Sequence, residues 1–144
     1  KALAPVVNDY DFILVDCPPS LGILSVMSLV AATHVLIPIQ TEFKALKGTE
    51  LLIKTVQEIK SIANNSLKIA GMVPTMATAR TIQTNQSIDS IQKIASQVGP
   101  VLPTVPRKTD FANASQERLP LALYASKNDA IGVLKGIALH LDNL

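Results

Sequence analysis

The sequence has too few cysteines for a disulfide-stabilised domain or a cysteine-rich zinc-binding domain. It has one cysteine, Cys17, and no tryptophan in 144 residues. A single cysteine excludes an internal disulfide and a cysteine-rich zinc site, and it favours a reducing compartment. We expect Cys17 to be a buried small hydrophobe rather than a reactive thiol. Aromatic residues are only 3% of the chain, so the core must consist of Ile, Leu, Val and Ala, which suits helices packed on a parallel sheet.

Long apolar runs are also missing. The longest, residues 21–32, is too short to cross a bilayer, which takes about 20 residues, and nothing at the N-terminus resembles a signal peptide. We therefore expect a cytoplasmic protein. The composition, 48% hydrophobic and 17% charged, is typical of one globular domain over residues 1–144. Because the chain begins at Lys1 without methionine and soon enters an apolar strand, we expect it to be a segment of a longer protein.

Neither sign of charge dominates the sequence. The formal net charge is +2, but residues 1–59 carry four basic and six acidic side chains, whereas residues 60–144 carry nine basic and five acidic ones. The second part is therefore +4 and the first −2. This asymmetry is compatible with a polyanionic partner, and it is equally common on ordinary protein surfaces.

Four short apolar runs predict strands, and segments with helical spacing separate them. The run Phe12-Ile13-Leu14-Val15 does not alternate with polar residues, which is typical of a strand covered on both faces. We predict strands at 10–16, 34–39, 67–73 and 101–105, and helices at 21–31 (buried and capped by Ser20), 44–63, about 81–99, 110–117 and 129–141. Repeated strand–helix–strand units imply parallel strands with right-handed crossovers. The predicted fold class is α/β, part of a doubly wound, mostly parallel sheet with helices on both faces.

Polar residues follow each predicted strand, at the edge where parallel sheets gather their ligands. They are Asp16-Cys17-Pro18-Pro19-Ser20, Gln40-Thr41-Glu42, Pro74-Thr75-Met76 and Pro106-Arg107-Lys108. In the first group, three apolar residues deliver the carboxylate of Asp16. This is the shape of a Walker B strand, whose aspartate holds Mg²⁺ beside nucleotide phosphates. Apolar strands also end in aspartate where Asp caps a helix or starts a turn, so the pattern alone leaves both interpretations open.

The longer string carries a more specific signal. Residues 10–22, YDFILVDCPPSLG, closely resemble the Walker B segment of the ParA/MinD family of deviant Walker A P-loop ATPases, especially its ParA and Soj members. The resemblance continues in the same order along the chain in three further segments. They are VLIPIQ (35–40) with Glu42, Thr75-Met76 with residues 79–81, and residues 105–107 with residues 111–114. It covers essentially the whole chain after residue 9.

This resemblance implies roles for individual residues. Asp16 would be the magnesium-associated catalytic carboxylate, and Pro18 would shape the site beside it. Thr75 and Pro106 would lie in loops that approach the adenine of ATP; the alternative is that they are plain loop residues. Arg80 and Arg107 match the positions of basic residues with which ParA-type dimers bind DNA non-specifically. Lys108 and Lys93 are weaker candidates for the same role. Solvated charges or surface ion pairs are the alternative for these four residues, and Glu42 matches a position near the subunit interface.

The family resemblance implies an ATP- and Mg²⁺-dependent ATPase for plasmid, chromosome or other cargo segregation. It would act as a nucleotide-sandwich homodimer on nucleoid DNA, stimulated by a ParB-like partner. No Gly-x-x-x-x-Gly-Lys-Ser/Thr loop occurs in this chain, and without such a loop nothing cradles the phosphates. We therefore expect the segment alone to be inactive. The alternatives are a MinD-like membrane-associated ATPase, disfavoured by a final helix with a single lysine, and a non-catalytic dimerisation or partner-binding module.

Overall fold

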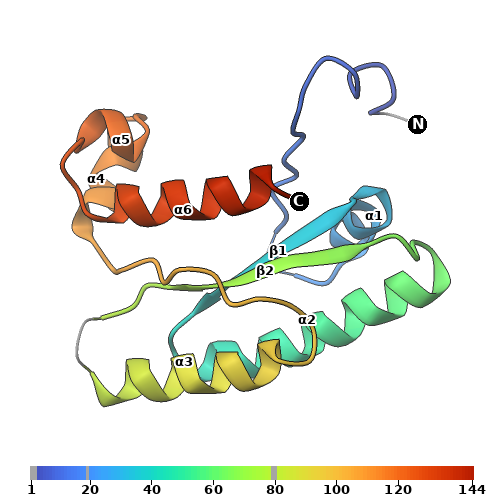
Figure 1. Cartoon of the computed structure of the whole chain (residues 1–144), viewed down its shortest axis with the longest axis horizontal. Coiled ribbons are helices and arrows are strands. Elements are labelled where there is room, and N and C mark those ends of the chain that lie inside the picture. The colour runs from blue at the N-terminus through green and yellow to red at the C-terminus, as the bar shows by residue number, and fades with distance from the viewer. Residues whose placement is uncertain (1–2, 19, 79–80) are drawn as a thin grey trace.

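A parallel pair of strands forms the centre of the molecule (Figure 1). The computed structural model describes residues 3–18, 20–78 and 81–144. Strand β1 (His34–Gln40) pairs with β2 (Lys68–Thr75) in register from His34 opposite Lys68 to Gln40 opposite Thr75, with one irregularity after Val35. Both strands lie where the sequence predicted them. The parallel α/β prediction is therefore confirmed.

The predicted strand at 101–105 lies beside β2, but it is not a continuous strand. The backbone N–H of Met72 donates to Pro100 O at 2.9 Å, and Leu102 N–H donates to Met72 O at 2.8 Å. The only bridges of this segment to β2 and its extension are parallel ones at Val101 and Pro106, among the described residues. The bond that would continue this ladder is one from residue 74 N–H to Leu102 O, and Pro74 of β2 has no N–H, which explains why a regular ladder does not form. The prediction was right in place and direction and wrong in regularity.

The predicted strand at 10–16 is wrong for this chain. Residues 12–18 have no regular secondary structure, and no backbone hydrogen bond joins them to β1 or β2 in the described part of the chain. Leu14 is 85% exposed and Phe12 52% exposed, and Cys17, expected to be buried, is exposed as well. A strand with two apolar faces needs a paired edge and cover on both sides, and here the segment has neither.

The helices begin and end close to the predicted positions. They are α1 (Ile23–Ala31), α2 (Phe43–Ile62), α3 (Ile82–Ala95), α4 (Thr109–Gln116), α5 (Leu121–Tyr124) and α6 (Ala130–Asp142). The one-turn helix α5, which starts directly after Pro120, was not predicted. Thr81 caps α3 by accepting a hydrogen bond from Thr84 N–H at 3.2 Å, as expected of a threonine at this position.

Helix α1 differs from its prediction in cap and burial. Its N-cap is Gly22, which makes no side-chain cap bond. Ser20 instead accepts, through its carbonyl oxygen, a 2.6 Å hydrogen bond from Ser25 Oγ. Only Ser25 and Leu29 of α1 are buried, whereas Ile23 is 71% exposed. The helix packs on α2 through the side chain of Leu29, so most of its apolar surface is open.

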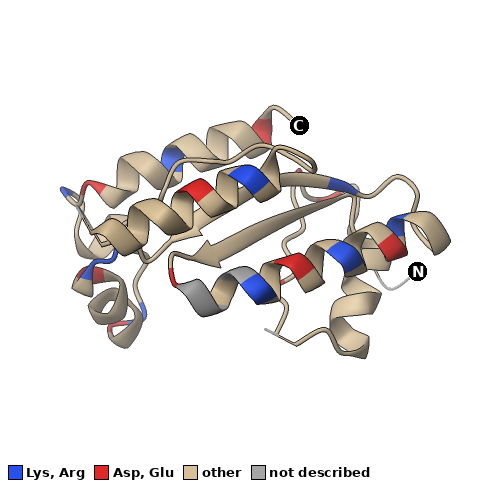
Figure 2. Cartoon of the chain, turned by 90° about the horizontal axis from the view of Figure 1, so that it is seen from below, with Lys and Arg blue, Asp and Glu red and all other residues tan. Residues whose placement is uncertain are grey.

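Helices cover both faces of the sheet, as predicted (Figure 1). On one face, α2 and α3 pack against the strands through a core that includes Ile37, Met72 and Ile91, each 1% exposed or less. On the other face, Ile137 of α6 packs against Val73 and Leu102. Lysines and acidic residues alternate along the outer side of α2 (Figure 2). Within the described ranges, no helix combines the length and the apolar character that crossing a membrane requires.

Candidate functional site

Three of the predicted strand ends meet at one edge of the sheet. Residues 40–42 lie at the end of β1, residues 74–78 at the end of β2, and residues 105–108 at the end of the irregular third segment. We call these three segments together the strand-end rim. Thr41 N–H donates to Thr75 O at 3.0 Å, and Arg107 N–H donates to Ala77 O at 2.9 Å. The parallel bridge between Ala77 and Pro106 completes the connection. The structure therefore brings together Thr75, Pro106 and Arg107, as the sequence predicted.

A small hollow opens on this rim next to the start of α3. Its volume is about 160 Å³, and its walls include Thr41, Met76, Thr81 and Arg107. Thr41 is only 4% exposed, and its Oγ1 donates to Met76 O at 3.4 Å, while Met76 has a left-handed backbone with φ of 55°. No role was predicted from the sequence for Thr41, which was named only as a strand-end residue, or for Thr81 and Thr84, because a threonine at a strand end or at a helix start carries no signal beyond turn and cap chemistry.

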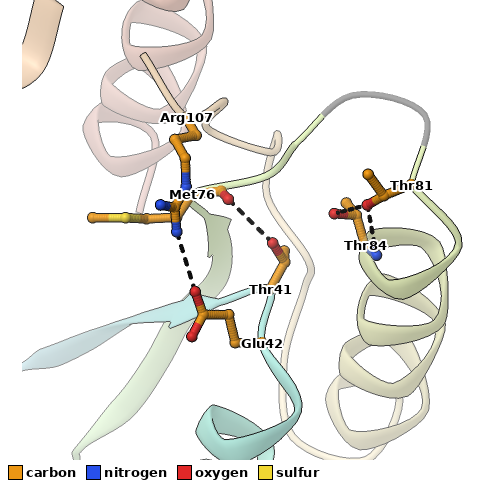
Figure 3. A network of polar contacts seen from close by, with 6 residues as sticks. All are labelled: Thr41, Glu42, Met76, Thr81, Thr84 and Arg107. Carbon is orange, nitrogen blue, oxygen red and sulfur yellow. Dashed lines mark hydrogen bonds and ion pairs between the residues drawn. The ribbon is translucent and has the colours of Figure 1, made fainter. Parts of the chain in front are cut away.

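Arg107 and Glu42 form an ion pair across the rim (Figure 3). The Arg107 Nη2–H donates to Glu42 Oε1 at 3.1 Å, and the two side chains are 55% and 54% exposed. Both residues were candidates from the sequence, Arg107 for DNA and Glu42 for the neighbourhood of the site. Their pairing was not predicted, since 65 positions separate them in the sequence. The surface-ion-pair alternative for Arg107 therefore holds in this structure.

Lys108 makes a second ion pair next to the first. Its Nζ lies 2.9 Å from Asp129 Oδ1, before the start of α6, and Lys108 remains 37% exposed. The hydrogen bond from Lys108 is the main cause that holds the pKa of the Asp129 carboxyl below its ordinary value of 3.8. A lysine held in this way can still meet an external phosphate, because an exposed pair exchanges partners readily.

Asp16, Pro18 and Lys93 make no described hydrogen bond to the rim. Asp16 and Pro18 are exposed in the segment without secondary structure, and no described hydrogen bond ties them to residues 40–42 or 74–78. Arg80 lies outside the described residues. Lys93 is exposed on α3, in an open groove of about 660 Å³ between α2 and α3 that also includes Lys47 and Lys54.

The described residues contain no group of three or more His, Cys, Asp or Glu side chains that could hold a metal ion. A lone carboxylate such as that of Asp16 would fit Mg²⁺ where water, nucleotide phosphates and any upstream ligand supply the other oxygens.

Comparison with known proteins agrees with the fold and extends over nearly the whole chain. The family model described as an AAA domain matches residues 1–69. The chain is 39% identical over 126 residues to the chromosome-partitioning ATPase Soj of Treponema pallidum, covering 86% of this chain and 49% of that protein. It is 36% identical over 143 residues to the sporulation initiation inhibitor protein Soj of Bacillus subtilis, covering 99% and 53%. The chain thus spans about half the length of these curated relatives.

Solved structures give the same fold. Cobyrinic acid a,c-diamide synthase from Mycobacterium smegmatis has a TM-score of 0.72 and 31% identity, covering 97% of this chain and 50% of that one. A complex of that protein with an ATP analogue and magnesium has a TM-score of 0.63 at 37% identity, covering 75% and 43%. An ATP complex of a Cyanothece McdA variant has a TM-score of 0.87 at 19% identity, covering 97% and 55%, and this likeness concerns the fold alone.

A parallel sheet with helices on both faces and polar strand ends on one edge defines the class as the α/β fold of P-loop nucleotide hydrolases. Within that class, the chain is homologous over most of its length to Soj and ParA proteins of the ParA/MinD family.

Proposed function

We propose that this chain is the C-terminal half of an ATP-dependent partitioning ATPase that positions a plasmid, a chromosome or another cargo. The observation that carries the proposal is the 36% identity to Soj of Bacillus subtilis over 143 residues, in which no large part of the chain is left unmatched. In this proposal, an upstream half supplies the phosphate-binding loop. The present chain supplies the strand-end rim, the adenine-facing loops and part of a DNA-binding surface.

ATP and Mg²⁺ are the proposed ligands of the complete protein. Asp16 holds the magnesium ion through water, Pro18 fixes the direction of the chain beside it, and Thr75 and Pro106 face the adenine. Support comes from the relative at 37% identity that was crystallised with an ATP analogue and magnesium. For Asp16 to act in this way, residues 12–16 must pair with strands of the upstream half, and the exposure of their apolar side chains here makes such pairing favourable. The metal supplies charge stabilisation for phosphoryl transfer when it is bound.

The proposed second ligand is DNA of any sequence, bound by a nucleotide-dependent homodimer on the nucleoid. Arg80, Arg107 and Lys108 are the proposed contacts. A guanidinium or ammonium group can bond phosphate oxygens without reading bases. Two of these residues are adjacent on the strand-end rim and remain partly exposed. A ParB-like protein on the cargo is the proposed stimulator of hydrolysis.

A MinD-like membrane-associated ATPase is the second candidate function. A membrane-binding helix lies on lipid with a basic polar face. Helix α6 does not fit that role, because it buries Ala130 and Ile137 against this chain's own core. A purely structural module remains the outcome to be tested by activity.

The proposal is tested with the full-length protein. Asp16→Ala should lower ATP hydrolysis about 100-fold or more, because a group that stabilises transition-state charge is lost, while the 144-residue chain alone should not bind ATP tightly. In gel retardation with arbitrary duplex DNA and ATP, Arg107→Gln should weaken binding to all sequences alike and reduce the salt slope by about one. Arg118→Gln is the matched control, since it removes one exposed arginine charge outside the rim. Unchanged hydrolysis in Asp16→Ala, or equal effects of the two arginine substitutions, would contradict the assignment.

A further inference from the structure

The Glu42–Arg107 ion pair joins two chain segments whose backbones are both held at the end of β2. Glu42 directly follows Thr41, which is buried and bonded to Thr75 and Met76. Arg107 is bonded through its backbone N–H to Ala77 O. The carboxylate and the guanidinium are therefore presented to each other by the fold, even though both side chains are more than half exposed (Figure 3).

We propose that Glu42 competes with DNA phosphate for Arg107, and so limits how tightly the protein holds DNA. This inference rests on the proposed DNA-binding function of Arg107. A guanidinium satisfies carboxylate and phosphate with the same planar set of donors. A DNA phosphate that takes the Nη2 donor of Arg107 displaces the Glu42 carboxylate, which then lies unpaired next to the phosphate backbone and repels it.

The exposure of the pair sets the size of the effect. An ion pair between solvent-exposed side chains is weak because water screens it and two long side chains must be ordered. Glu42 therefore cannot block DNA binding; it can only reduce it, by about two- to fivefold on the scale of exposed ion pairs. A weak, easily displaced competitor suits a protein that must let go of DNA repeatedly, because it favours release without preventing capture.

Glu42 also gives Arg107 a defined direction. With the carboxylate present, the guanidinium is paired with Glu42, and both residues line the hollow together with Thr41, Met76 and Thr81. Without it, the side chain is free to sample other rotamers. Competition and positioning therefore act in opposite directions on DNA affinity, and the sign of the Glu42→Gln effect decides between them.

The experiment measures DNA affinity and salt dependence in the full-length protein with ATP, for Glu42→Gln, Arg107→Gln and the double variant. We expect Glu42→Gln to raise affinity about two- to fivefold for every sequence and to leave the salt slope undiminished. We expect no gain from Glu42→Gln when Arg107 is already glutamine, because the competitor then has nothing to compete for.

Glu58→Gln is the matched control. It removes one exposed carboxylate from α2, 16 residues beyond Glu42 and so about 24 Å further along the helix. A gain in Glu58→Gln equal to that in Glu42→Gln, or a gain that persists in the double variant, would overturn the inference in favour of a general charge effect. Weaker binding in Glu42→Gln would overturn it in favour of positioning alone.

The outcomes separate this inference from the function on which it rests. If Arg107→Gln leaves DNA binding unchanged, the proposed DNA surface is wrong. If Arg107→Gln weakens binding and Glu42→Gln changes nothing, the DNA surface stands and only the competition is wrong.

Discussion

Two regions of this chain use apolar residues in opposite ways. From β1 to α3, many apolar side chains are buried: Met72 and Ile91 are both 0% exposed. In residues 12–31, an equally apolar sequence remains open, with Leu14 85% and Ile23 71% exposed. Composition does not distinguish these regions. What differs is whether the chain itself provides a second surface: α2 and α3 cover β1 and β2, whereas no described segment pairs with residues 12–18 or covers the outer side of α1.

The largest test of this comparison is a pair of substitutions, Ile91→Ala and Leu14→Ala, in the 144-residue chain. Ile91→Ala should lower the free energy of unfolding by about 2–5 kcal/mol, because it leaves a cavity in a fully packed core. Leu14→Ala should change it by less than about 0.5 kcal/mol, as surface substitutions usually do. Urea denaturation followed by circular dichroism measures both. Equal losses would show that residue 14 is packed in the isolated chain.

The same leucine substitution sharpens the comparison when it is made in the full-length protein. If residues 12–16 pair with upstream strands there, Leu14→Ala should cost about 2–5 kcal/mol, the range for a buried leucine. A cost that stays near zero in both contexts would remove the proposed strand, and with it the position proposed for Asp16.

Another prediction contrasts Gly71, in the packed region, with the exposed Gly132. A Cβ at Gly71 would lie 2.7 Å from Leu102 Cγ and 2.9 Å from its Cδ1, so Gly71→Ala should destabilise the chain by about 1–3 kcal/mol through overpacking. A Cβ at Gly132, in α6, meets nothing within 4 Å. Gly132→Ala should therefore stabilise the chain by about 0.4–1 kcal/mol. Thermal unfolding distinguishes the two variants by the sign of the change in Tm. A change of the same sign in both would contradict the close contact between residue 71 and Leu102.

The sequence predicts the packed region well, because there local pattern and final environment agree. Helical spacing in 44–63 and the short apolar runs around 34–39 and 67–73 correspond to α2, β1 and β2. The run at 12–15 misleads for a physical reason: an unbroken apolar sequence indicates burial on two faces, and it does not specify which chain segment supplies the cover. The one-turn helix α5 is too short for any periodicity to reveal it.

The candidate site is predictable in kind and not in detail. Because the strands are parallel, residues 40–42, 74–78 and 105–108 must lie at the same edge of the sheet. The polar groups in these three segments therefore converge. The ion pair between Glu42 and Arg107 depends on side-chain geometry across 65 positions of sequence, which no local pattern encodes. The role of Asp16 stays a prediction, because its segment lacks the strand that would orient it.

The smallest expected effect comes from surface charge outside the packed region, at the Lys108–Asp129 pair. Lys108 holds the pKa of Asp129 below 3.8, so the folded state binds this proton more weakly than the unfolded state does. The pair therefore adds stability above the unfolded pKa, and that stability is lost as pH falls through the lower folded pKa. Asp129→Asn should slightly destabilise the chain at about pH 7 and much less at about pH 3, and added salt should shrink the difference at neutral pH. Urea denaturation at both pH values measures it, and a difference independent of pH would mean that Asp129 acts through its backbone position rather than its charge.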